Sequence, residues 1–581
     1  MTVSWKHSGN SGVETNLSEI PARRGFSLSY NGKTLLSRID PVTQAERLAA
    51  ELKLGEATLY LCPSPLYGYG LPLLLERLSE TGHNSAILCL EFDEGLFKLS
   101  EKAMAENREK FSPFANDKNL ALIRVFSPED ACFFVRKTWG GRRFRRVESI
   151  HFGGGWQLFP QLYGQAEALL GREISLEWGN AMTLIRLGRL YTKNFIQNLS
   201  CFCKSGNAAL DFGALPTLVL GAGPSLDPVL DGLSSLWGGR IPQPPDRNFR
   251  IVCVDSCLAA LNERGIRPDL VVILESQHWN LRAFIGLGWG EINAALDLSS
   301  LPASARLQWS NTYFYTTAWT ELRLFARLEK EGLLPRRIAP LGSVGLSAVA
   351  LALGCSLGPV LTAGIDFSYT LDACHARSTP GHRDLETRQN RLKGFSASAT
   401  AFRDGTFSAV SKTGKKVRCD PAMRNYRELF EKEFGAESRL YDIEGPGLPL
   451  GVKPVSPNEA FAILNGSSEV SGGLRTQAEK RRLTPDEKQR SQKMIRFIRR
   501  EMDYLKAIKE ILSGISSLGQ ARLGELLETA DYLWAHFPEC AGAGLSGPPV
   551  DDLSFLKRVR IEIEPFLKNW EMTLEELERV P

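Results

Sequence analysis

The residues best suited to acid–base chemistry follow an apolar stretch that ends at Asp366. Tyr369, His375 and His382 come next, within one polar and aromatic segment. An imidazole titrates close to neutral pH, so a loop histidine can accept the proton of a substrate hydroxyl group. His375 is therefore our candidate general base, ahead of His382, and Asp366 would orient it or hold substrate hydroxyl groups. Structural hydrogen bonds would explain both residues almost as well.

An apolar strand followed by glycines predicts a second chemical feature, a binding site for an anion. The run 218–220 leads into Gly-Ala-Gly-Pro-Ser-Leu-Asp at residues 221–227, called the glycine turn below. Glycines let a backbone turn sharply and approach a ligand, and the free N–H groups at a helix start favour an anion. The residues predicted to hold a phosphate are Gly221, Gly223, Pro224 and Ser225. The third glycine of the dinucleotide fingerprint is absent, and a tight turn without a ligand fits the segment equally well.

Further polar residues are predicted at the same edge of a parallel sheet. Asp255 and Glu275 each end an apolar run, and Ser343 follows a glycine at the start of a helix. The carboxyl ends of parallel strands meet at one edge of a sheet, where ligands bind. We expect Asp255, Glu275 and Tyr369 to contact a donor substrate there, and Ser343 to bind its carboxylate or phosphate. Turn and helix capping are the alternative roles of these side chains.

The elements that would position these residues predict an α/β protein of about three domains. Residues 1–200 form a Rossmann-like module, with a strand at 26–30, a hairpin turn after it, and a helix capped by Asp40. Strands at 58–62 and 85–91 flank a glycine loop. Because Pro63 and Pro65 crowd that loop, we expect no cofactor in this module. Two helices at 161–197 would connect it to the next domain.

The second domain, at 206–455, is predicted to be a Rossmann-like parallel sheet, with strands near 218–220, 250–256, 268–276, 313–317 and 359–366. The third, at 474–581, is a predicted helical bundle. Its first helix begins at Thr484, since a threonine followed by proline and two acids is a strong start signal. Its last helix, near 551–577, should kink or break at Pro565.

Composition narrows the classes of function. The chain has 581 residues and a formal net charge of +4, from 70 basic and 66 acidic side chains, so no concentrated basic surface for nucleic acid is expected. The 11 cysteines are scattered, which is typical of reduced thiols in a cytoplasmic protein. We find no apolar stretch long enough to span a membrane and no signal segment at the N-terminus.

Taken in order, these motifs resemble the motility-associated factor (Maf) glycosyltransferases, which glycosylate bacterial flagellin, over about residues 20–460. Their central region is similar to 6-hydroxymethylpterin diphosphokinase MptE-like proteins. The resemblance rests on the glycine turn, Asp255-Ser256, Gly265-Ile266-Arg267-Pro268-Asp269, Gly342-Ser343-Val344, Gly364-Ile365-Asp366-Phe367-Ser368-Tyr369, His375-Ala376 and Gly445-Pro446-Gly447-Leu448-Pro449-Leu450-Gly451. The chain departs from the family at Glu275, where aspartate is usual, and at Leu341, where a glycine is frequent.

The resemblance implies an enzyme with a sialyltransferase-like central domain, needed for motility. It would transfer a sialic-, pseudaminic- or legionaminic-type nonulosonic acid from a CMP-sugar to Ser or Thr of flagellin. The chain contains no Asp-x-Asp pair, so we expect no metal and no cofactor besides the CMP-sugar substrate. One alternative is ATP-dependent pyrophosphoryl transfer to a hydroxymethylpterin, with Mg²⁺ held by Asp255, Asp269 or Asp366. The other alternative is a non-catalytic flagellin-binding protein. Each of these functions is compatible with a homo-oligomer.

Overall fold

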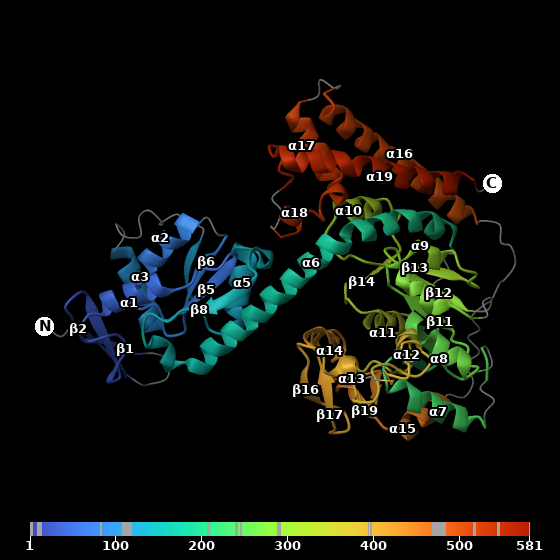
Figure 1. Cartoon of the computed structure of the whole chain (residues 1–581), viewed down its shortest axis with the longest axis horizontal. Helices are drawn as coiled ribbons and strands as arrows, with labels where there is room; N and C mark the ends of the chain where they lie inside the picture. Colours follow the sequence, from blue (N-terminus) through green and yellow to red (C-terminus); the bar gives the residue numbers. More distant parts are fainter. Residues whose placement is uncertain are drawn as a thin grey trace. The chain divides into compact units, whose positions relative to one another are not determined.

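The chain forms two compact units. The computed structural model describes residues 4–8, 14–81, 84–106, 119–205, 210–238, 242–244, 247–287, 292–392, 394–395, 398–466, 484–514, 519–542 and 547–579. The first unit comprises residues 1–187 and 534–548, and the second 188–533 and 549–581 (Figure 1). The division into 1–200, 206–455 and 474–581 stays a prediction, and residue 474 lies outside the described residues.

The first unit begins with an antiparallel sheet of order β1-β2-β3-β4. Its strands are β1 (Ser4–Ser8), β2 (Glu14–Pro21), β3 (Phe26–Tyr30) and β4 (Lys33–Thr34). The predicted hairpin turn lies between β3 and β4, where Asn31 and Gly32 have φ angles of 48° and 81°. Asn and Gly tolerate this left-handed conformation better than other residues, which is why the pair closes the hairpin.

A four-stranded parallel sheet of order β7-β6-β5-β8 completes the first unit and confirms the predicted Rossmann-like module. Its strands are β5 (Thr58–Pro63), β6 (Ala86–Glu91), β7 (Leu120–Arg124) and β8 (Arg146–Ser149). The helices are α1 (Pro41–Glu51), α2 (Leu71–Thr81), α3 (Glu94–Glu106), α5 (Pro128–Thr138) and the short α18 (Pro538–Gly542). Asp40 caps α1 as predicted, because its carboxylate accepts the N–H of Thr43 at 2.9 Å.

One long helix, α6 (Pro160–Lys204), replaces the two predicted at 161–197, so that prediction was wrong. Its first half contributes Tyr163 and Leu170 to the core of the first unit. Its second half buries Phe195 and Leu199. A glycine costs a helix only about 1 kcal/mol relative to alanine, so the buried apolar residues outweigh the glycines within α6.

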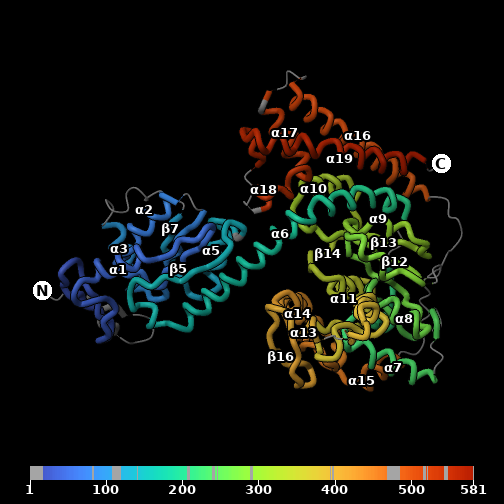
Figure 2. The backbone as a smooth tube through the Cα atoms, viewed as in Figure 1, coloured from blue at the N-terminus to red at the C-terminus, as the bar shows by residue number. Residues whose placement is uncertain are grey.

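The second unit is built on a nine-stranded parallel sheet, which confirms the predicted parallel-sheet fold. The strand order is β14-β13-β12-β11-β10-β9-β15-β18-β19, and Figure 2 traces the chain through it. The strands are β9 (Thr217–Leu220), β10 (Arg250–Val254), β11 (Leu270–Ile273), β12 (Asn293–Asp297), β13 (Thr312–Thr317), β14 (Arg336–Ile338), β15 (Val360–Ala363), β18 (Leu440–Ile443) and β19 (Lys453–Val455). Consecutive strands run outward from β9 to β14, and the chain then returns to place β15 on the other side of β9. The boundary between β9 and β15 is therefore the topological switch point, where ligands bind in such sheets.

The helices of this unit are α7 (Leu226–Leu236), α8 (Leu258–Glu263), α9 (Pro302–Ala305), α10 (Arg323–Lys330), α11 (Val344–Cys355), α12 (Pro380–Thr387), α13 (Ser398–Ala401), α14 (Pro421–Phe434) and α15 (Pro457–Asn465). Two 3₁₀ turns, η4 (Asp255–Cys257) and η5 (His278–Phe284), follow β10 and β11, and a small hairpin pairs β16 (Phe407–Val410) with β17 (Lys416–Cys419). Asn194 of α6 donates to the carbonyls of Ser276 and Ser299 at 2.9 and 3.1 Å. This amide fixes the chain where it leaves β11 and β12.

The helical C-terminal region agrees with the predicted bundle. Its helices are α16 (Pro485–Leu512), α17 (Gln520–Thr529) and α19 (Leu553–Glu578), and α16 lies beside α19 (Figure 1). Thr484 forms the predicted capping box at the start of α16. The helix α19 continues through Pro565, so it does not break there. No helix among the described residues is long and apolar enough to cross a membrane.

Candidate functional site

The two turns at the switch point lie directly against each other. The glycine turn follows β9, and residues 364–367, called the β15 turn below, follow β15. Gly223 donates its N–H to the carbonyl of Gly364 at 2.8 Å. A Cβ on Gly221 would overlap the carbonyl of Gly364, and one on Gly364 would overlap that of Gly221. The glycines therefore permit the close approach of a second stretch of backbone, where we had predicted the close approach of a ligand.

Asp366 occupies the position that we had predicted for a phosphate. Its Oδ2 accepts the N–H of Ser225, the residue before α7, at 2.7 Å. The Ser225 hydroxyl in turn accepts the N–H of Gly364 at 2.8 Å. Both residues are buried, and Gly447 packs directly over the carboxylate. A carboxylate at a helix N-terminus is favoured for the same reason as a phosphate, so Asp366 satisfies the N–H of Ser225 at this end of α7 internally.

His375 lies on an exposed loop beside the glycine turn. The next residue, Ala376, donates its N–H to the carbonyl of Ala222 at 3.0 Å, which anchors the loop to the turn. The His375 ring packs against Gly381, and no hydrogen bond joins its imidazole to any described residue. Removal of part of the ring from water lowers the pKa of His375, and the nearby His382 lowers it further. The predicted base is thus neutral and accessible at neutral pH, and Asp366 does not orient it.

Tyr369 belongs to a buried polar cluster below this loop. Its hydroxyl donates to Asp420 at 3.0 Å, and Arg403 pairs with the same carboxylate. Tyr369 is 5% exposed, and burial followed by the Asp420 contact raises its pKa. The Tyr369 hydroxyl therefore helps to hold the loop in place. The predicted contact between Tyr369 and a donor substrate stays a prediction.

Asp255 lies in η4, directly after β10. The carboxyl is buried, and its Oδ1 accepts the N–H of Ser256 at 2.7 Å. Burial raises the pKa of Asp255 to about 7, against the opposing effect of donors on Ser256 and Asn280. Glu275, exposed after β11, also contributes to the raised pKa of Asp255, so the two predicted donor-site acids lie near each other. A carboxyl with such a shifted pKa at a strand end is typical of functional sites.

The raised pKa of Asp255 predicts that stability depends on pH. Between about pH 4 and pH 7 the folded protein holds a proton that the unfolded chain has released. Stability should therefore fall as pH rises through this range, by up to about 4 kcal/mol. Asp255→Asn cannot ionise and should flatten the dependence. Denaturant unfolding of both proteins at pH 5 and pH 8 checks this, and an identical pH dependence would contradict it.

Ser343 precedes α11, whose N-terminus has no capping side chain. The Ser343 hydroxyl makes no cap hydrogen bond, and it is half-buried. Within the described part of the chain, no acceptor satisfies the first N–H groups of α11, at Val344, Gly345 and Leu346. Gly345 packs near Ile365 of the β15 turn, so this helix start lies beside the switch point. Unlike the N–H of Ser225 before α7, these N–H groups can still accept an anion.

Asp269 lies at the opposite edge of the sheet. It precedes β11, where its carboxylate pairs with Arg247 and accepts the N–H of Ile251 at 2.8 Å. It therefore cannot share a ligand with Asp255 or Asp366, which follow the carboxyl ends of β10 and β15. Among the residues with described positions, no three His, Cys, Asp or Glu side chains are grouped so that they could hold a metal ion.

The structure thus brings most of the predicted site residues to one edge of the sheet. Sequence reasoning missed two side chains of η5, the exposed Trp279 and the buried Asn280. The turn η5 contacts η4, which contains Asp255, and α12 contacts η4 as well. A tryptophan shortly after a strand end was the available signal in the sequence. In the structure its ring is partly exposed and contacts the ring of His278 and the guanidinium group of Arg282.

Comparison with other proteins supports the fold. Residues 193–372 match the family described as 6-hydroxymethylpterin diphosphokinase MptE-like. An uncharacterized protein of Treponema pallidum (strain Nichols) is 27% identical over 580 residues, with 96% of each chain covered. The structure of a Maf glycosyltransferase from Magnetospirillum magneticum AMB-1 is similar, with a TM-score of 0.52 and 15% identity, over 99% of this chain and 93% of that one. The expected resemblance, a Maf-like fold with an MptE-like central region, is confirmed.

Proposed function

We propose that this protein is a glycosyltransferase that moves a nonulosonic acid from a CMP-sugar to Ser or Thr hydroxyl groups of flagellin. The observation that carries the proposal is the position of the exposed His375 beside the switch point, where the next residue bonds to the glycine turn. The similarity in fold to a Maf glycosyltransferase over nearly the whole chain supports the reaction class. Donor, acceptor and role in motility come from the resemblance described above.

In the proposed reaction, the acceptor oxygen forms a bond to the anomeric carbon of the sugar. The bond from that carbon to a phosphate oxygen of CMP breaks, and CMP leaves with the electron pair. His375 takes the acceptor proton. A monophosphate leaving group carries less charge than a diphosphate, so N–H groups and a helix dipole can stabilise it without a metal.

We place the donor phosphate differently from the prediction made from the sequence. The N–H of Ser225 is already satisfied by Asp366, whereas the start of α11 is open. We therefore assign the donor phosphate or carboxylate to Ser343 and the first N–H groups of α11. Asp366 becomes a positioning residue, which ties the glycine turn to the β15 turn. The exposed ring of Trp279 offers a surface on which the cytosine base can stack.

The pterin diphosphokinase is the second candidate, because the matching family carries that description. Of the three carboxylates considered for Mg²⁺, Asp269 lies at the far edge of the sheet and Asp366 is enclosed by the turns. Only Asp255 and the neighbouring Glu275 are left for such a role. This arrangement favours the transferase.

Donor binding distinguishes the two candidates. Full-length protein should bind CMP in calorimetric titrations, and Ser343→Ala should weaken that binding by about 10-fold, since a hydrogen bond to a charged group is lost. Ser235→Ala, at the far end of α7, serves as the control and should bind CMP as the unchanged protein does. With a CMP-nonulosonate present, purified flagellin should gain the mass of the sugar. Binding of ATP with Mg²⁺ in place of CMP would instead support the diphosphokinase.

A further inference from the structure

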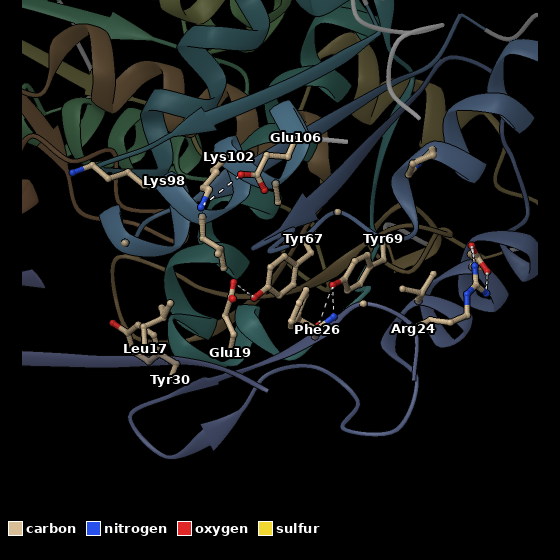
Figure 3. A pocket seen from close by; sticks show the side chains of 18 of the residues that line it. Leu17, Glu19, Arg24, Phe26, Tyr30, Tyr67, Tyr69, Lys98, Lys102 and Glu106 are labelled. Atoms are coloured by element: carbon tan, nitrogen blue, oxygen red, sulfur yellow. Dashed lines mark hydrogen bonds and ion pairs between the residues drawn. The ribbon is translucent and has the colours of Figure 1, made fainter. Parts of the chain in front are cut away.

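The first unit contains a cavity of about 890 Å³ that plays no part in the proposed transfer reaction. The hairpin of β2 and β3 lines one side, the loop after β5 another, and α3 a third (Figure 3). The loops after β5 and β6 lie at the carboxyl edge of the parallel sheet, where α/β proteins bind ligands. The volume lies within the range of small-molecule sites.

Three aromatic rings form one wall of this cavity. The rings of Tyr67 and Tyr69 stack at 5.3 Å with an interplanar angle of 19°, and Phe26 lies 6.4 Å from Tyr67. The Tyr69 hydroxyl accepts the N–H of Phe26 at 2.8 Å and fixes the hairpin to the loop. The ring of Phe26 is 45% exposed, so it is available to a ligand.

Most charged groups around the cavity are neutralised by neighbours. Arg24 pairs with Glu46 at 2.8 Å, and Lys102 pairs with Glu106 at 3.6 Å. The remaining lysine, at the start of α3, is paired within its helix. Asp93 is also occupied, because one oxygen accepts the N–H of Leu96 and the other the hydroxyl of Tyr30.

Glu19 is the exception to this neutralisation of charged groups by their neighbours. This half-buried carboxylate lines the cavity, and its side-chain partner is the hydroxyl of Tyr67, at 2.7 Å. Among the described residues, no Lys, Arg or His side chain lies within ion-pairing distance of it. Figure 3 shows Glu19 beside Tyr67 and close to Phe26. A negative charge next to aromatic faces is the combination that recognises organic cations.

We propose that this cavity binds a small organic cation, a protonated amine whose apolar body lies against Phe26 and Tyr67 and whose ammonium group contacts Glu19. An anion would be repelled by Glu19. A neutral molecule of the same shape would leave that charge without a partner in a partly desolvated site, which costs free energy. The paired lysines and Arg24 offer no unneutralised positive charge to compete with the ligand.

A matched pair of probes tests the charge requirement. Phenethylamine is protonated at neutral pH, and 2-phenylethanol has nearly the same size and shape without the charge. Calorimetric titration of the full-length protein should show saturable binding of the amine, at least about 10-fold tighter than that of the alcohol. Equal binding of the two probes, or no saturable binding of the amine, would overturn the proposal.

Two variants locate the interaction. Glu19→Gln keeps an acceptor for Tyr67 and should weaken binding of phenethylamine by about 10-fold, to the level of the alcohol. The control, the double variant Lys102→Gln/Glu106→Gln, removes an ion pair of the same cavity without changing its net charge, and should leave binding unchanged. Phe26→Ala, at an exposed ring, should weaken both probes. If Glu19→Gln bound the amine normally, the proposal would fail, whatever the outcome of the sugar-transfer assay.

Discussion

Replacing His375 with alanine should lower the rate of sugar transfer to flagellin by about 10²- to 10⁴-fold, the usual contribution of a general base. The ring makes no hydrogen bond to a described residue and lies on an exposed loop, so its removal should leave the fold intact. Flagellin binding should therefore be unchanged. Mass spectrometry of flagellin incubated with a CMP-nonulosonate, together with a pull-down of flagellin, measures the two properties separately.

The pH dependence of transfer identifies His375 more directly. A general base works in its neutral form, and the pKa of His375 is lowered by partial burial and by His382. Activity should therefore persist below the pH at which an ordinary histidine becomes protonated. His382→Gln removes the neighbour that lowers the pKa of His375, so it should shift the acidic limb of kcat/KM to higher pH with little change in the plateau. Transfer that survives His375→Ala, with an unaltered acidic limb, would exclude this residue as the base.

The elements that sequence predicted best are those whose signals are local. Asp40 and Thr484 cap helices through side chains that lie within three residues of the N–H groups they accept. The hairpin after Tyr30 follows from an Asn-Gly pair in the same way. The strand β12 was missed because Asn293–Asp297 contains no β-branched or aromatic residue, and burial between neighbouring strands makes it a strand.

The sequence predicted the residues of the site in outline, but it could not predict the contact between Ser225 and Asp366. Ser225 and Asp366 are separated by 141 positions in the chain, and nothing in either segment indicates that one satisfies the other. A helix N-terminus predicts an anion equally well whether that anion is a phosphate or a carboxylate of the same chain. The strand order that brings β15 beside β9 settles which of the two is present. Ser343 gained importance because, among the described residues, no side chain caps the start of α11 as Asp366 does beside α7.

The glycines of the switch point are likewise compatible with two kinds of neighbour, a ligand or another part of the chain. A glycine without a Cβ permits close approach, but the sequence does not say of what. In this protein the neighbour is backbone, since Gly221 and Gly364 each face the carbonyl of the other. A substitution there should consequently act on stability before it acts on ligand binding.

Gly364→Ala should destabilise the second unit by about 3–5 kcal/mol. Gly364 has a φ angle of 72°, which costs a residue with a Cβ about 1–2 kcal/mol, and the new methyl group would also overlap the carbonyl of Gly221. Moving the β15 turn away would break the Ser225–Asp366 and Gly364–Ser225 hydrogen bonds. Hydrogen exchange at the amides of β9 and β15 during denaturant titration measures this unit specifically.

Gly405→Ala is the matched control. Gly405 also has a left-handed φ angle, 84°, but among the described residues other than its two chain neighbours, no atom lies within 4 Å of the position that its Cβ would take. The left-handed backbone should thus cost Gly405→Ala the same stability as Gly364→Ala, about 1–2 kcal/mol, and the new methyl group should add no overlap. The difference between the two variants isolates the cost of separating the two turns. If both variants lost the same stability, the close packing of these turns would not be what holds the switch point together.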